Sequence, residues 1–314
     1  MSALPSSSLL SAAAAAAGGQ TYPGATLYVV ATPIGNLADF SLRAIHVLAL
    51  ADAVACEDTR VSGGLMRHLG LDKPLIALHE HNEHSASDKV LARLAAGERV
   101  AYVSDAGTPA ISDPGAVLVA RARAAGYRVM PLPGASSVVT ALSAAGDAGQ
   151  HDQPGQGAGF VFLGFLPAKG QDRAQALQAA LQQPLSTVLF EAPHRIEALV
   201  AELAEHAPAR LITLCRELTK QFEQIHTLPA VDAPAWLAAD AQRLRGEFAV
   251  VLHAQPKVEA DTDGLPAAVE RQLVILMREL PLKQAVALAA ELSGSPRNAL
   301  YQRALALRAQ NEPD

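Results

Sequence analysis

The sequence is short of cysteine and of positive charge, and both shortages restrict what the protein can be. Its two cysteines, Cys56 and Cys215, lie in apolar, strand-like surroundings, which predicts buried thiols in a reducing compartment and no disulfide. The chain has 25 basic and 31 acidic side chains and a formal net charge of −6. A chain of this charge does not coat nucleic acid through a general positive field, so any RNA-binding surface has to be local.

Long hydrophobic runs are also missing. Every stretch of 18 residues is interrupted by glycine, proline or polar residues, so we expect no membrane span and a cytoplasmic protein. Residues 1–25 are rich in Ser, Ala and Gly and contain no charged side chain. The apolar run at 9–17 lacks the preceding Lys or Arg of a signal peptide. We therefore predict that residues 1–25 form a disordered extension.

The remaining residues predict an α/β fold with two domains and a helical tail. The length of 314 residues and the 50% hydrophobic content suffice for two cores. Short apolar runs alternate with helical patterns in residues 26–147, which predicts a mostly parallel sheet. Residues 148–159 have no apolar side chain larger than alanine and predict a linker. We expect a second domain with a mixed sheet over 160–256 and a helical tail over 257–314.

Three loops of small and polar residues follow predicted strands of the first domain. They are TPIGN at 32–36, SDAGTPAISDPG at 104–115 and PGASS at 133–137. In an open α/β sheet, ligands bind in the crevice outside the carboxyl ends of the strands. The loops therefore predict one ligand site. Their glycine spacing matches neither a dinucleotide fingerprint nor a phosphate-binding loop with its lysine.

Seven motifs carry a resemblance to a known family, and the resemblance extends over about residues 27–254. They are ATPIGNLAD at 31–39, CEDTR at 56–60, SDAGTPAISDPG at 104–115, PLPGAS at 131–136, GFLP at 164–167, FEAPHR at 190–195 and ELTK at 217–220. Together they resemble the ribosomal small-subunit methyltransferase I family of the tetrapyrrole-methylase superfamily. The resemblance implies a two-domain tetrapyrrole-methylase-like fold that binds S-adenosylmethionine between its domains. It also implies a homodimer that methylates the 2′-hydroxyl of a cytidine in the decoding region of 16S rRNA.

The resemblance further implies which residues line the cofactor. One departure concerns the second loop, where the superfamily usually has Gly-Asp-Pro and this chain has Gly107, Thr108 and Pro109. The change from acid to threonine matches the rRNA-modifying branch. The implied cofactor-binding residues are Thr32, Pro33, Ile34, Gly35, Gly107, Thr108, Ile111, Ser136, Ser137 and, from the second domain, Phe190.

Methyl transfer to a ribose hydroxyl needs alignment of the reacting atoms and, unless alignment alone suffices, a base that accepts the hydroxyl proton. The candidate bases are Asp58, Asp105, Glu191 and His194. Asp105 lies in the most unusual loop and is the first candidate. Its carboxylate could equally cap the turn, and that alternative stays open.

Three basic residues inside the motifs, Arg60, Arg195 and Lys220, are interpreted as substrate contacts to phosphate or carboxylate groups. For Lys220 the alternative is a salt bridge with Glu217 or Glu223. The run HEHNEH at 79–84 does not have the spacing of a zinc-binding helix, so we predict no metal site.

The role of the helical tail has two alternative interpretations, and the function of the whole protein has two rivals. Residues 281–308 carry four basic side chains and one acidic one, with a pattern of helix, short glycine turn and helix. This pattern indicates either an RNA-contacting helix pair or a helical appendage that packs on the body or on a second subunit. The rival functions are methylation of a small tetrapyrrole-like substrate and non-catalytic binding to the ribosome.

Overall fold

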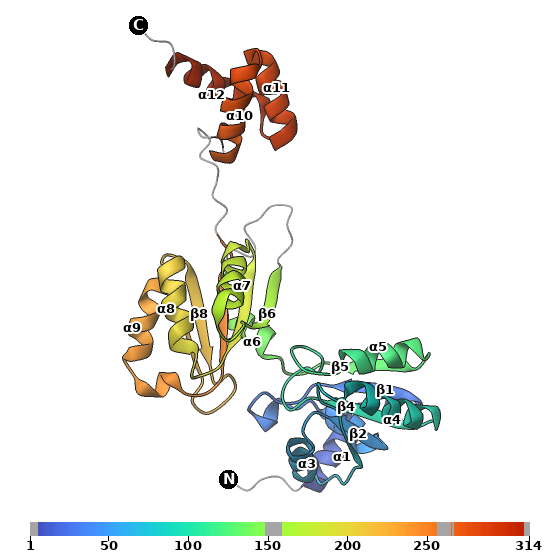
Figure 1. Ribbon diagram of the computed structural model, residues 1–314. Helices are drawn as coiled ribbons and strands as arrows, with labels where there is room; N and C mark the ends of the chain where they lie inside the picture. Colours follow the sequence, from blue (N-terminus) through green and yellow to red (C-terminus); the bar gives the residue numbers. More distant parts are fainter. Residues whose placement is uncertain (1–5, 148–158, 256–264, 266, 311–314) are drawn as a thin grey trace. The chain divides into compact units, whose positions relative to one another are not determined.

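The computed structural model describes residues 6–147, 159–255, 265 and 267–310 (Figure 1). The chain divides into two compact units, residues 1–255 and 256–314. The predicted linker at 148–159 lies, apart from residue 159, outside the described residues. Among the helices that the structure describes, none has both the length and the hydrophobicity needed to cross a membrane.

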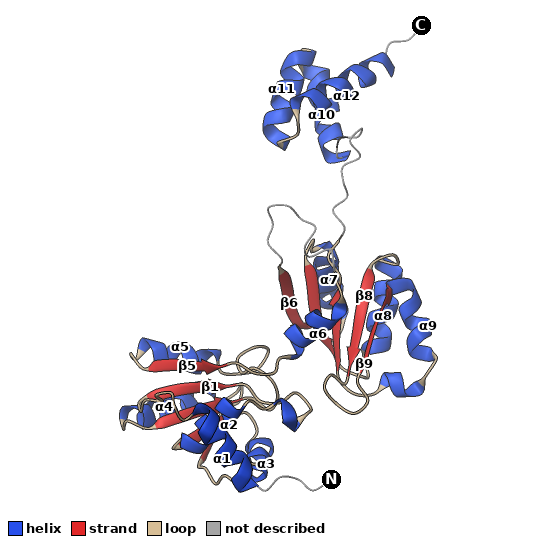
Figure 2. Cartoon of the chain, turned by 180° about the vertical axis from the view of Figure 1, so that it is seen from behind, coloured by secondary structure: helices blue, strands red, loops and turns tan. Residues whose placement is uncertain are grey.

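The first unit contains a parallel five-stranded sheet in the order β3-β2-β4-β1-β5. Figure 2 shows its strands in red, with β1 and β5 labelled. All neighbouring strands in this sheet are parallel, as the alternation of strands and helices predicted. Because both faces are covered by helices, the central strands are apolar except at their first residues, such as Thr26 and Arg99. The strands are β1 (Thr26–Val30), β2 (Ala53–Cys56), β3 (Leu75–Ala77), β4 (Arg99–Val103) and β5 (Arg128–Leu132).

Helices cover both faces of this sheet. On one face, α1, α2 and α3 contribute Ala13, Ile45 and Met66 to a core shared with the strands. On the other face, α4 and α5 contribute side chains such as Val90 and Leu118. These helices are α1 (Ser6–Ala17), α2 (Leu42–Leu50), α3 (Thr59–His68), α4 (Glu83–Ala95) and α5 (Ala116–Ala124).

The prediction of a disordered extension over residues 1–25 is wrong for the part that the structure describes. Alanine has the highest helix propensity, and residues 6–17 form α1. The helix is held by tertiary contacts, since Ala13 is fully buried and the Tyr22 hydroxyl donates to the Ala17 carbonyl at 3.2 Å. The Tyr22 ring also contacts the ring of His46 on α2, with the centroids 5.2 Å apart.

The second sheet of the first unit is mixed, as predicted, with the order β6-β7-β10-β8-β9. Only β6 and β7 are parallel, and the other neighbours are antiparallel. One face packs against α7, α8 and α9, and the other packs against α6. The elements are β6 (Phe160–Phe165), β7 (Ser186–Glu191), β8 (Leu211–Arg216), β9 (Gln224–Pro229), β10 (Phe248–Leu252), α6 (Ser137–Ala145), α7 (Gly170–Gln182), α8 (Ile196–His206) and α9 (Ala233–Ala238). Cys56 on β2 and Cys215 on β8 are buried free thiols, as the sequence predicted.

The second unit is a bundle of three helices with its own core. Leu273, Val286 and Leu300 are buried between α10, α11 and α12. Gly294 ends α11 in the left-handed conformation, with φ of +68°, so the predicted sequence of helix, glycine turn and helix is confirmed. The helices are α10 (Ala267–Glu279), α11 (Leu282–Ser293) and α12 (Arg297–Gln310).

Candidate active site

The loops that follow β1, β4 and β5 meet at one edge of the first sheet. The chain runs from β1 to β2 and β3 and then returns to β4 beside β1, so the strand order reverses here. Two backbone hydrogen bonds join the first two loops, since the Thr32 N–H donates to the Gly107 carbonyl at 2.9 Å and the Gly107 N–H donates to the Thr32 carbonyl at 3.1 Å. The predicted convergence of these loops is confirmed at the place where α/β sheets bind ligands.

The third loop is tied to the second by a side chain. The Thr108 hydroxyl donates a hydrogen bond to the Ala135 carbonyl at 3.1 Å. An aspartate carboxylate only accepts hydrogen bonds and could not make this contact. Gly107 has φ of +82°, and a Cβ added there would lie 3.3 Å from Cγ2 of Ile34. Ser136 precedes α6 and Ser137 is its first residue, and both are half-buried. The three loops therefore form one continuous lining for the predicted ligand site.

The far end of the second loop is anchored in the core. The buried Tyr102 ring donates its hydroxyl proton to the Pro114 carbonyl, and the Glu83 carboxylate accepts from the Gly115 N–H at 2.8 Å. Before these anchors, the loop exposes Ile111, whose side chain is predicted to contact the cofactor.

Asp105 connects the second loop to the end of β2. Its carboxylate accepts a hydrogen bond from the Asp58 N–H at 3.1 Å. Asp105 therefore also caps backbone, as the alternative interpretation of this residue allowed. Burial raises the pKa of the Asp105 carboxyl, and the nearby Asp58 carboxylate adds to the increase. Asp58 itself caps α3 and binds the guanidinium of Arg60, and these hydrogen bonds lower its pKa to about 2. Of these two aspartates, Asp105 is thus the stronger base.

Two further carboxyl groups at this edge were not among the predicted site residues. Burial raises the pKa of Glu57, as do the carboxylates of Asp105 and Asp113. The pKa of Asp113 is also raised by burial, with a smaller contribution from Asp105. Both residues lie inside quoted motifs, and the position of Glu57 directly after β2 was the signal that could have identified it.

Phe190 brings the second sheet to the same region. Its ring contacts the rings of Phe162 and Phe165 with centroids 4.9 and 5.7 Å apart. Phe190 and Ile34 both pack against one apolar cluster, which contains Val138 of α6. The structure therefore places two of the predicted cofactor residues, Ile34 of the first loop and Phe190 of the second sheet, against the same apolar cluster.

Glu191 occupies a different environment from the other candidate bases. Its side chain is fully buried between Arg173, at 3.4 Å, and Arg195, at 2.9 Å. Arg195 also donates to the Leu166 carbonyl at 2.7 Å. Both residues are thus engaged in holding the end of β7, whereas His194 is exposed on the loop that follows. This engagement disfavours Glu191 as the base and Arg195 as a substrate contact.

Replacing Glu191 with glutamine tests this structural role. The amide keeps the shape of the side chain but removes the charge that compensates two guanidinium groups, so the free energy of unfolding is expected to fall by about 2 kcal/mol. Urea denaturation measures the loss. The kcat of the folded variant should stay within about twofold of the parent, because a general base contributes far more than twofold. A loss of kcat by two orders of magnitude without a loss of stability would restore Glu191 as a catalytic candidate.

Lys220 forms the salt bridge with Glu217 that the sequence allowed, at 2.8 Å, and a second one with Glu247 at 3.0 Å. Its aliphatic stem lies over Gly35, where an added Cβ would be 2.5 Å from Cγ of Lys220. Glu217 and Thr219 both have positive φ, of 52° and 67°. The ELTK loop thus has a strained backbone and packs against the first loop.

Within the part of the chain that the structure describes, no cluster of three His, Cys, Asp or Glu side chains could hold a metal ion. In the histidine-rich run at 79–84, residues 80–82 form a turn and residues 83 and 84 begin α4. The Asn82 side chain accepts from the His79 N–H at 2.9 Å.

Comparisons with known proteins agree with this architecture. Residues 26–234 match the family described as Tetrapyrrole (Corrin/Porphyrin) Methylases. Among solved structures, diphthine synthase aligns with a TM-score of 0.55 at 16% identity, covering 73% of this chain and 90% of that chain. Uroporphyrin-III-C-methyltransferase from Thermus thermophilus aligns with a TM-score of 0.51 at 21% identity, covering 73% and 94%. The chain therefore belongs to the tetrapyrrole methylase family and has its fold.

Closer relatives define the branch. The ribosomal RNA small subunit methyltransferase I of Escherichia coli O157:H7 is 46% identical over 283 residues, which cover 89% of this chain and 94% of the relative. The protein of the same name from Pseudomonas aeruginosa is 46% identical over 281 residues, covering 89% and 96%. Residues 263–308 match the family described as RsmI C-terminal HTH domain. The chain belongs to the ribosomal RNA small subunit methyltransferase I family, as its motifs predicted.

Proposed function

We propose that this protein transfers a methyl group from S-adenosylmethionine to the 2′-hydroxyl of a cytidine in the decoding region of 16S rRNA, as a homodimer in the cytoplasm. The observation that carries the proposal is the Asp105 carboxylate, which has a raised pKa and lies among three interlocked loops of small residues. The high identity to relatives named for small-subunit rRNA methylation supports the choice of substrate.

The loops fit S-adenosylmethionine by their shape and chemistry. Gly107 and Gly134 let backbones approach closely, since an added Cβ at Gly134 would lie 2.8 Å from Cβ of Ala31. When bound, the cofactor supplies a methyl group on a positively charged sulfur. The residues that hold it are Thr32, Pro33, Ile34, Gly35, Gly107, Thr108, Ile111, Ser136, Ser137 and Phe190.

The side chains around these loops have separate tasks. Asp105 accepts the proton of the ribose hydroxyl, because its raised pKa makes it a better base than an ordinary aspartate at neutral pH. Asp58 keeps the end of β2 in place through its hydrogen bonds to Arg60 and through its N–H to Asp105. Arg60 is 89% exposed and is the best placed of the three predicted cations to contact an RNA phosphate.

The proposal is tested with small ribosomal subunits that lack rRNA modifications. The purified protein is incubated with these subunits and isotopically labelled S-adenosylmethionine, and the digested rRNA is mapped by mass spectrometry. Label on one cytidine ribose is the expected result. Binding of the cofactor without any label on rRNA would overturn the substrate assignment, and label on a porphyrin-like compound in parallel reactions would redirect it to a small molecule.

A further inference from the structure

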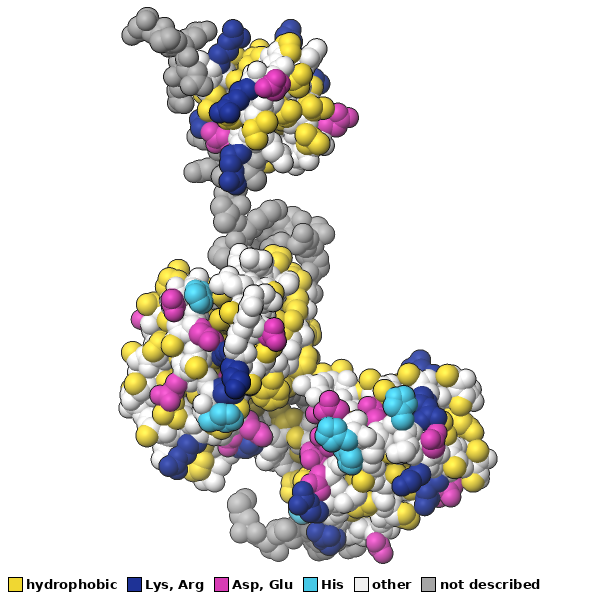
Figure 3. All heavy atoms as spheres, viewed as in Figure 1, with side chains coloured by type: hydrophobic (Ala, Val, Ile, Leu, Met, Phe, Trp, Pro, Cys, Tyr) yellow, Lys and Arg dark blue, Asp and Glu magenta, His cyan; other side chains and the backbone are white. Residues whose placement is uncertain are grey.

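The helical unit formed by α10, α11 and α12 differs in charge from the rest of the chain. Of the 25 basic and 31 acidic side chains, residues 265–310 contain six basic and three acidic ones. One of the acids, Glu270, is paired with Arg303. Lys and Arg side chains are spread over the visible face of this unit, at the top of the space-filling view (Figure 3). This unit is therefore the local basic surface that an otherwise acidic chain requires for RNA.

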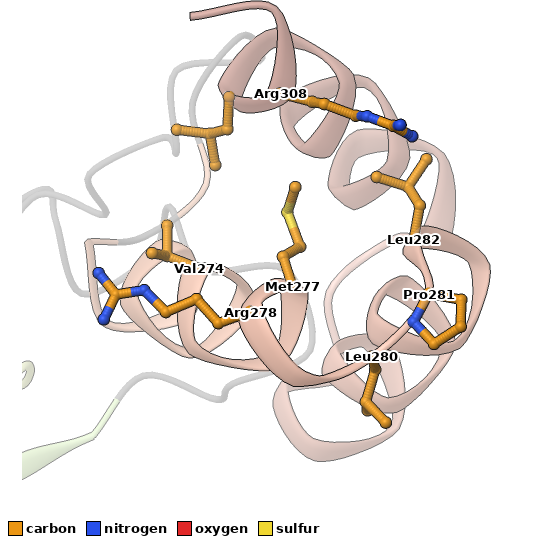
Figure 4. Close-up of a pocket in the computed structure, with 8 residues that line it drawn as sticks. Val274, Met277, Arg278, Leu280, Pro281, Leu282 and Arg308 are labelled. Carbon is orange, nitrogen blue, oxygen red and sulfur yellow. The ribbon is translucent and has the colours of Figure 1, made fainter. Parts of the chain in front are cut away.

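A hollow of about 430 Å³ opens on this unit. Its apolar lining includes Val274 and Met277 of α10 and Leu282 of α11, and Met277 points into the hollow (Figure 4). Arg278 and Arg308 lie on opposite sides of it. An apolar floor of this size between two guanidinium groups matches a nucleobase with its flanking phosphates, because guanidinium groups pair with phosphates and stack on bases.

A second hollow of about 270 Å³ lies between α11 and α12. Its lining contains two exposed cations, Lys283 and Arg297, together with Asn298 and Tyr301. Lysine, arginine, asparagine and tyrosine all donate hydrogen bonds, and phosphate oxygens are acceptors. This hollow therefore has the chemistry of a contact to the backbone of a nucleic acid.

We propose that the helical unit binds a single-stranded segment of the rRNA substrate. One unpaired base enters the hollow at Met277, and the phosphates on either side contact Arg278, Lys283 and Arg297. This inference rests on the proposed function for the identity of the RNA. It assigns to the second unit most of the affinity for RNA, because the edge of the first sheet is rich in carboxylates and offers Arg60 as its proposed phosphate contact.

The test uses the full-length protein and a fluorescently labelled single-stranded RNA. The double variant Arg278→Glu with Lys283→Glu reverses two exposed charges, and the Kd for RNA is expected to rise at least tenfold. The slope of log Kd against log salt should decrease in magnitude by roughly 1.4, because each contact to a single strand contributes about 0.7. With small subunits as substrate, KM should rise by a similar factor while kcat and the Kd for S-adenosylmethionine stay unchanged.

Two further variants separate the effect of the helical unit's charges from that of the hollow and from a general effect of charge reversal. Lys89→Glu reverses an exposed charge on α4 and should leave the Kd for RNA within twofold of the parent. Met277→Trp fills the hollow without changing charge, so it should weaken RNA binding and leave the salt slope unchanged. Circular dichroism checks that each variant keeps its helices.

The outcomes distinguish this inference from the proposed function. An unchanged Kd for RNA in the double variant overturns the inference, even if rRNA is methylated. If the variants change the sedimentation of the protein but not its RNA binding, the surface contacts protein and the inference is also wrong. If the protein binds RNA through this unit but labels no ribose, the inference stands and the proposed reaction fails.

Discussion

Replacing Asp105 with asparagine is expected to lower kcat about 1,000-fold, because an amide cannot accept the proton of a ribose hydroxyl. The oxygen of the amide can still accept from the Asp58 N–H, as the carboxylate does at 3.1 Å, so the loop should keep its conformation. Binding of S-adenosylmethionine is therefore expected to remain within about threefold of the parent. Single-turnover methylation and calorimetric titration of the cofactor measure the two effects.

The matched control is Asp72→Asn, which alters an exposed aspartate outside the three loops and should leave kcat unchanged. The pH profile gives a second readout. Since burial raises the pKa of Asp105, kcat/KM of the parent should decrease as the pH is lowered through a value above the ordinary aspartate pKa of about 3.9. Undiminished turnover by Asp105→Asn would eliminate Asp105 as the base, and methyl transfer would then depend on alignment alone.

Replacing Gly115 with alanine is expected to lower the free energy of unfolding by about 4 kcal/mol, as the sum of overpacking and backbone strain. An added Cβ would lie 2.2 Å from Cε1 of Tyr102 and 2.6 Å from its hydroxyl oxygen. The Tyr102 ring is fully buried and its hydroxyl is bound to the Pro114 carbonyl, so the ring cannot move aside. The φ of Gly115 is +120°, which an L side chain rarely adopts.

Gly97→Ala separates the two contributions to that loss. Gly97 also has positive φ, of +86°, but nothing lies within 4 Å of an added Cβ. This variant should lose only the strain term of about 1–2 kcal/mol. Urea denaturation of both variants gives the comparison. Equal losses in the two would show that Tyr102 yields to the methyl group and that the second loop is less firmly anchored than its contacts indicate.

Much of the fold could be predicted from the sequence, because most strands of both sheets are short apolar runs that end at glycine, proline or polar residues. The first helix could not. A run of alanines without charge has the helix propensity but no amphipathic stripe, and the residues with which it shares a core, such as Ile45 of α2, are distant in sequence. The convergence of the three loops followed from the parallel topology, since carboxyl ends of adjacent strands share an edge.

The electrostatic roles of individual site residues could not be predicted from the sequence. Glu191 and Arg195 belong to a conspicuous motif and pair with each other, yet Glu191 also pairs with Arg173, which lies outside the motif. Glu57 gained significance only once its half-buried side chain was found near the carboxylates of Asp105 and Asp113. A pKa depends on burial and on charges that are close in space, and neither quantity is encoded in the spacing of a motif.

The hydrogen bonds between the loops also bear on how fast and how tightly a ligand binds. The Thr32–Gly107 pair and the Thr108 bond to Ala135 fix the backbone of all three loops against one another. A ligand that enters a preorganised lining loses mainly its own translational and rotational freedom and does not have to order the protein. Association with the first unit should therefore follow single-exponential kinetics, with a rate constant that increases linearly with ligand concentration and shows no plateau from a slow loop closure.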